Sequence, residues 1–238
     1  MKKLLLAALL GALTAGARAD DLALRIEHDS TVVGADGVTR NVRFAERLIR
    51  RDAQSWLARV LPPGAHEEAE HAAGGKGHKH MDTAAATRWV TRAPDGKLRV
   101  RLVNDHDRMI VDIAPVDYAN IGFDGRWSTA AQLIDPDQVA RMKASGRSAP
   151  AGTRWYESGT PDARVQVLWD EKDKYPRRIE SANAAGTRRS TLTATRESLP
   201  ATMPWYGATP EQPTNSVWTS SRTAKCKTTC GRATLLWA

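Results

Sequence analysis

The stretch VQVLWDEKDKYPRRIESANAAGTRRSTLTAT, residues 165–195, decides the fold. Apolar and polar residues alternate through 165–170, 177–181 and 187–195, which is the two-residue period of β-strands. A proline-containing turn separates the first two strands, and Ala184-Ala185-Gly186 forms a hairpin turn before the third. Strands joined by turns this short predict an antiparallel meander.

The rest of the chain extends this pattern in both directions. Further alternating stretches predict strands at 22–26, 42–50, 55–60, 98–102, 109–113 and 153–157. Short helices are expected at 115–120, at 128–134, from Asp135-Pro136-Asp137 onward, and at 84–89 after a cap at Asp82. The predicted order is a set of strands, then short helices, then a second set of strands. A parallel nucleotide-binding sheet instead alternates strand and helix along the chain. We therefore predict an α+β fold: a strongly curved antiparallel β-sheet, or half-barrel, with a few short helices on its concave side.

The two ends of the chain differ from this central part. Lys2 and Lys3, the apolar run 4–13 and the small-residue site Ala17-Arg18-Ala19 predict a secretory signal peptide at 1–19. The folded domain is expected at 20–198, with a polar insert at 64–82. From 199 to 238 the periodicity is lost, and four prolines and a polar stretch predict an irregular or disordered tail. Export through a cleaved signal places the mature protein in the periplasm, and no other apolar run suits a membrane-spanning helix.

Charge and motifs exclude several function classes. The chain carries a formal charge of +8, and removing residues 1–19, with three basic residues and no acid, leaves +5. The remaining basic residues mostly alternate with apolar ones on predicted strands, as on a solvated sheet face, so we expect no nucleic-acid partner. The Ser-x-x-Lys, GxSxG and HExxH motifs are absent, and we expect no enzymatic activity.

The strand pattern resembles a known group of envelope proteins. Residues 50–59, RRDAQSWLAR, are similar to the early hairpin of the periplasmic LolA/LolB/RseB-like group, and residues 165–195 are similar to its closing strands. The resemblance covers residues 22–196 as a pattern, with no invariant motif. It implies a half-barrel with a helical plug and an apolar cavity. Members of the group bind or sense lipoproteins or lipids, so it implies a carrier of an apolar ligand or lipoprotein, or a sensor that binds another envelope protein through a sheet edge.

Large aromatic side chains are the candidates for the wall of such a cavity. The chain has eight tryptophans, and the segment IGFDGRW at 121–127 is a tight turn with two aromatic residues. Aromatic side chains line cavities for apolar ligands, although core packing explains most of them equally well. The expected wall residues are Trp89, Phe123 and Trp127, with contributions from Met109 and Val111.

The insert supports an alternative function. It holds four of the six histidines, His66, His71, His78 and His80, together with carboxylates and Met81. Imidazole, carboxylate and thioether ligands suit Cu, Zn or Ni, so the alternative is a metal-binding or metal-responsive periplasmic protein. A solvated loop whose histidines bind nothing specific explains the composition as well, and this insert departs from the pattern of the LolA-like group.

The two cysteines lie in the tail. Cys226 and Cys230 are the only pair, and in an oxidising compartment an even number predicts a disulfide. A metal site shared between this CxxxC spacing and the histidine insert is the alternative.

Overall fold

The computed structural model describes residues 21–62, 85–104, 109–160 and 162–201. Within these ranges the strands form one open antiparallel sheet, in the order β6-β5-β4-β3-β2-β1-β11-β10-β9-β8-β7. The strands are β1 (Leu22–Val33), β2 (Thr39–Arg51), β3 (Gln54–Val60), β4 (Thr87–Arg92), β5 (Leu98–Asn104), β6 (Met109–Ile113), β7 (Lys143–Ala144), β8 (Thr153–Thr160), β9 (Ala163–Asp170), β10 (Tyr175–Asn183) and β11 (Arg188–Arg196).

Two meanders meet in the middle of the sheet. Strands β1 to β6 follow one another outward on one side, and β11 to β7 do so on the other. The first and last strands join the two halves, because Leu24 of β1 pairs with Arg196 of β11 and Val32 with Arg188. The predicted antiparallel sheet is therefore confirmed, including the meander of residues 165–195.

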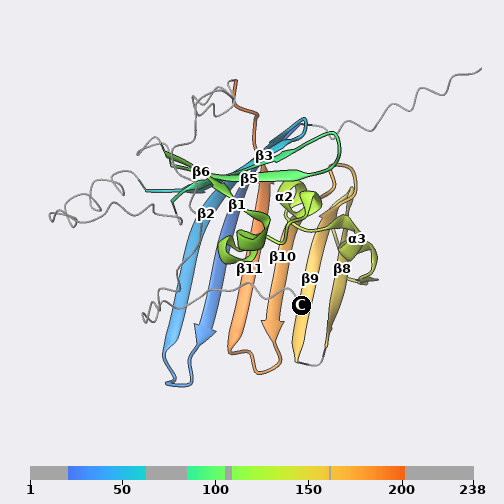
Figure 1. Ribbon diagram of the computed structural model, residues 1–238. Helices are drawn as coiled ribbons and strands as arrows, with labels where there is room; N and C mark the ends of the chain where they lie inside the picture. Colours follow the sequence, from blue (N-terminus) through green and yellow to red (C-terminus); the bar gives the residue numbers. More distant parts are fainter. Residues whose placement is uncertain (1–20, 63–84, 105–108, 161, 202–238) are drawn as a thin grey trace, which may run out of the picture.

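Three short helices connect the two arms of the sheet across its concave side. They are η1 (Pro115–Ile121), α2 (Trp127–Gln132) and α3 (Pro136–Ala140). Side chains of the first two segments, including Phe123, pack on Val90 of β4, whereas Val139 of α3 packs on Val167 of β9. Since β4 and β9 lie far apart in the strand order, this continuous segment can contact both only because the sheet bends around it. Figure 1 shows the helices in front of one end of the long strands, away from the hairpin tips.

Buried polar side chains fix helix α2 to the sheet. The hydroxyl of Ser55 donates to the carbonyl oxygen of Ala130 at 2.6 Å, and Nη1 of Arg50 donates to that of Ala131 at 3.2 Å. The last carbonyls of a helix have no partner inside it, so these two bonds satisfy groups that would otherwise be buried unpaired. The helix is thereby held against β2 and β3.

Two local predictions are wrong. Residues 87–89 of the expected helix at 84–89 belong instead to strand β4, which pairs with β3 and β5; the proposed cap, Asp82, lies outside the described residues. The three alanines favour a helix, but pairing on both sides overrides that propensity. Pro176 lies inside β10 rather than in the preceding turn, at a register shift between Pro176 and Arg178, where a missing N–H is tolerated.

Candidate functional site

The concave face carries a continuous band of apolar side chains across six strands. Cross-strand partners project to the same side of a sheet, so the register identifies each row of side chains. One row, here called the apolar stripe, is Phe44, His28, Leu192, Ile179, Val167 and Tyr156. Val167 and Ile179 are buried under the α3 segment, whereas Phe44, Leu192 and Tyr156 are half-buried. The stripe thus marks the edge of the helix-covered core.

The next row toward the hairpins is made mostly of small hydroxyl side chains. This serine row consists of Ser30, Ser190, Ser181 and Ser158, with Val42 at one end and Val165 between the last two serines. The hydroxyls of Ser181 and Ser190 are 2.6 Å apart and form one hydrogen bond, in which either hydroxyl can donate. Val42 is 42% exposed although it is apolar. This row of mostly small side chains crosses six strands beside the apolar stripe and is about 24 Å long at roughly 4.8 Å per strand.

The serine row leads to a pocket at the β8 end of the sheet. The pocket has a volume of about 710 Å³ and is lined by Ser158, Met142, Lys143 and Asn183, among others. Its walls are mixed in polarity, and the Arg164–Glu157 ion pair on its rim is 2.9 Å long. None of the five predicted cavity residues lines it.

A compact polar cluster lies at the opposite end of the apolar stripe. The imidazole of His28 stacks on Phe44 with ring centres 4.3 Å apart, and its Nε2 lies 2.8 Å from Oε2 of Glu46. The guanidinium of Arg59 also lies over the Phe44 ring, 4.0 Å from the ring centre. Arg59 pairs with Glu46 in the strand register, yet among the described residues it forms no ion pair. The carboxylate of Glu46 is instead bonded to His28.

A second arginine lies beside this cluster. Arg88 of β4 pairs with Leu57 of β3, and its guanidinium is 5.2 Å from the centre of the Phe123 ring. Burial lowers the pKa of Arg88, while the carboxylates of Glu46 and Asp124 act at a distance to raise it. Within the described part of the chain, Arg88 has no ion pair or hydrogen bond. The two arginines are thus matched in number by Glu46 and Asp124, but among the described residues neither carboxylate forms an ion pair with either guanidinium.

The structure places two of the predicted wall residues together. Phe123 is 3% exposed and packs with Tyr118, its ring centre 5.3 Å from that of Tyr118, and Trp127 packs against the same cluster. The intervening turn has the predicted form, since Gly122 and Gly125 adopt φ values of 68° and 75° that favour glycine. Phe123 and Trp127 therefore belong to the contact between the helices and β4–β5.

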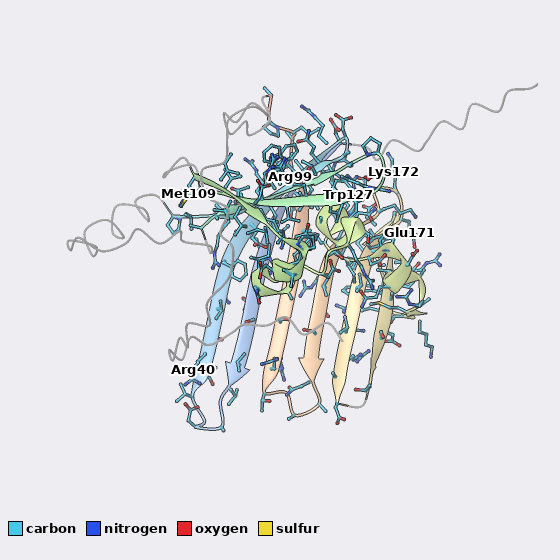
Figure 2. The ribbon with its side chains drawn as sticks, viewed as in Figure 1. Arg40, Arg99, Met109, Trp127, Glu171 and Lys172 are labelled. Atoms are coloured by element: carbon cyan, nitrogen blue, oxygen red, sulfur yellow. The ribbon has the colours of Figure 1, made fainter. Side chains whose placement is uncertain are left out.

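The other three predicted residues lie elsewhere. Trp89 is on the convex face, where it stacks on Trp56 with ring centres 6.2 Å apart and donates to Oε1 of Gln54 at 3.1 Å. Met109 and Val111 lie half-buried on the edge strand β6. Figure 2 shows Met109 well separated from Trp127 across the sheet. The sheet itself thus separates Trp89 from Phe123 and Trp127.

The predicted metal ligands and cysteines lie outside the described residues. His66, His71, His78, His80, Cys226 and Cys230 therefore stay predictions, as do the signal peptide and the metals Cu, Zn or Ni. Across the described ranges, no three His, Cys, Asp or Glu side chains are grouped to hold a metal ion. The same ranges contain no helix of the length and apolarity needed to cross a membrane.

Sequence reasoning missed the polar cluster at the β2–β4 end. A signal was available, because the alternation of Leu22, Leu24 and Ile26 continues to His28 and places it on the same face as the core. The same alternation along β2 places Phe44 on that face as well. The approach of Arg59 and Arg88 could not be found this way, since it depends on the pairing of β4, which the sequence predicted as a helix.

Comparisons with known proteins identify similar folds. No protein-family model matches the chain, and no curated protein matches it. Similar solved structures include an uncharacterized conserved protein from Thermus thermophilus, with a TM-score of 0.37, 8% identity, and coverage of 75% of this chain and 81% of that one. A putative outer membrane lipoprotein-sorting protein domain from Vibrio parahaemolyticus is similar with a TM-score of 0.31, 6% identity and coverage of 74% and 85%.

A third similar structure is a LolA superfamily protein from Nitrosomonas europaea, with a TM-score of 0.32, 8% identity, and coverage of 76% of this chain and 88% of that one. Two of these three structures are thus described as a lipoprotein-sorting domain or a LolA superfamily protein, and the chain is similar to them with TM-scores of 0.31 and 0.32.

Proposed function

We propose that this chain is an exported, non-enzymatic binding protein that carries an apolar or amphiphilic ligand, such as a lipid, an acyl chain or a lipoprotein, on its concave face in the periplasm. The observation that supports it best is the apolar stripe beside the serine row. Large apolar side chains such as Leu192 lie half-buried there next to small ones, so a bound chain would cover apolar area without displacing bulky groups. Each buried methylene of such a chain contributes about 0.8 kcal/mol.

The two ends of the serine row carry different groups. Phe44 and the arginine-bearing cluster lie at one end, and the pocket lined by Ser158 lies at the other. An acyl chain laid along the serine row would have its length defined by six strands. The aliphatic chain needs no hydrogen bonds, and the hydroxyls of Ser181 and Ser190 are already joined by one bond in which either can donate.

Filling the serine row with a large side chain is expected to weaken binding strongly. In Ser190→Trp a bulky ring occupies the row, whereas in Thr191→Trp the ring projects from the next residue of β11 on the convex face. We expect Ser190→Trp to weaken binding of a fluorescent fatty acid by about tenfold or more, and Thr191→Trp to change it by less than about twofold.

The measurement is a fluorescence titration of both variants, with thermal unfolding to confirm that each is folded. Equal affinity in the two variants, or equal loss in both, would contradict the placement of the ligand on the concave face.

A further inference from the structure

We propose that Arg59 and Arg88 form a subsite for the phosphate headgroup of an amphiphile whose chain lies along the serine row. This inference rests on the proposed function, because it defines the class of ligand that the concave face takes. It predicts an anionic phospholipid-type ligand, with its phosphate at the β3–β4 end and its chain directed toward β8.

The two arginines lie on neighbouring strands, on the concave face of the sheet. Leu57 of β3 pairs with Arg88 of β4, and Arg59 is two residues further along β3 on the same face. The β3–β4 ladder ends at the Leu57–Arg88 pair, so Arg59 lies just beyond its end, and both arginine side chains are long enough to reach past a neighbouring strand. In this subsite one phosphate lies between the two guanidinium groups, and each guanidinium offers several donors in a planar fork that matches phosphate oxygens.

Within the described residues, neither Arg59 nor Arg88 forms an ion pair with a carboxylate. Glu46, which faces Arg59 in the strand register, is bonded to His28 at 2.8 Å, and Asp124 accepts bonds from Thr129 and from the backbone of Arg126. The other arginines that stack on aromatic rings differ: Arg101 over Trp89 also bonds Asp112, and Arg147 over Trp155 also bonds Glu180. A partly buried guanidinium without a counter-ion is costly, and an anionic ligand would remove that cost.

The two arginines also adjoin apolar surface of the concave face. Arg59 lies over Phe44, which begins the apolar stripe, and Arg88 lies over Phe123, which belongs to the cluster beneath the helices. The rings hold the guanidinium planes while leaving the N–H groups at their edges free to donate. A phosphate bound there would be followed at once by apolar surface, as in an amphiphile.

The experiment compares three probes by calorimetry below their micellar concentrations. Lysophosphatidic acid carries both phosphate and chain, monoacylglycerol with the same chain carries no charge, and glycerol 3-phosphate carries no chain. The proteins are the wild type, the double variant Arg59→Gln/Arg88→Gln, and the control Arg101→Gln, which removes a ring-stacked arginine from the convex face.

We expect the double variant to bind lysophosphatidic acid at least about tenfold more weakly, with monoacylglycerol affinity changed by less than about twofold and Arg101→Gln like wild type. Unchanged affinity of the double variant for lysophosphatidic acid would overturn the subsite. If the double variant does not fold, salt provides the test: lysophosphatidic acid binding by the wild type should weaken as NaCl rises while monoacylglycerol binding does not, and salt-independent binding overturns the subsite.

Different results would contradict the phosphate subsite and the carrier function. Monoacylglycerol that binds normally, with no preference for the phosphate, removes the subsite and leaves the carrier function. If glycerol 3-phosphate binds through the two arginines and monoacylglycerol does not bind at all, the result supports the anion subsite. It contradicts the binding of an acyl chain along the serine row.

Discussion

Phe123→Ala is expected to lower the free energy of unfolding by about 3–5 kcal/mol. The ring is 3% exposed and lies between Tyr118 of η1 and Val90 of β4, so its removal leaves a cavity where the helices meet the sheet. Backbone bonds restrain collapse of that cavity, because the N–H of Phe123 donates to the carbonyl of Tyr118 at 2.9 Å. Chemical denaturation followed by tryptophan fluorescence measures the loss.

Val116→Ala is the matched control for this variant. Val116 lies in η1, yet it is 85% exposed, so we expect a change within about 0.5 kcal/mol. A small effect of Phe123→Ala together with lost ligand affinity would contradict the assignment of Phe123 to the core and would return it to the wall of a cavity.

Asp170→Ala is expected to destabilise the protein by about 3 kcal/mol. The carboxylate is 3% exposed and organises the turn between β9 and β10: it accepts bonds from the backbone of Lys172 at 3.0 Å and of Asp173 at 2.9 Å, and from Nε of Arg177 at 2.8 Å. Alanine leaves these donors without their acceptor. The turn joins strands that carry the buried end of the apolar stripe, so the loss should reach the core and appear in the midpoint of thermal unfolding.

Asp112→Ala serves as the comparison for Asp170→Ala. Asp112 also binds arginine side chains, Arg99 at 2.6 Å and Arg101 at 3.2 Å, but its side chain is 36% exposed. Exposed pairs contribute little, so we expect a loss of no more than about 1 kcal/mol. Equal effects of the two substitutions would contradict the role assigned to Asp170.

The same buried carboxylate, Asp170, predicts a pH dependence. Burial alone would raise the pKa of Asp170, but the N–H of Asp173 and the guanidinium of Arg177 outweigh it, and the pKa is lowered from the usual 3.8. The unfolded state therefore binds the proton more readily, so the contribution of Asp170 is complete above pH 3.8 and is lost as the pH falls through the lower folded-state pKa. The stability difference between wild type and Asp170→Asn should shrink below pH 3.8, and a difference that grows there would contradict this sign.

The sheet could be predicted because its strands alternate clearly. The pairing of Leu192 and Ala194 on one face and Thr191 and Thr193 on the other follows from periodicity alone. The start of α3 was predictable as well: Asp135 accepts from the backbone of Asp137 at 3.1 Å, and Pro136 occupies the first turn.

The candidate site was harder to predict because its position depends on pairing between distant strands. Trp89 and Val90 are adjacent and both apolar, so composition does not tell which of the two faces the helices; the register places Val90 on the concave face and Trp89 against Trp56. Arg59 and Arg88 are distant in the sequence, and only the β3–β4 pairing places both on the concave face at the same end of the sheet. Long-range pairing of this kind is not contained in local periodicity.

The most direct measurement of the central claim is photolabelling with a lysophospholipid whose acyl chain carries a diazirine. After irradiation of the complex, mass spectrometry locates the labelled residues. We expect label on the concave face, around Val42, Ser190 and Val165, and an unlabelled competitor should remove it. Competable label on the convex face around Thr191 and Thr193, or no competable label among these strands, would contradict it.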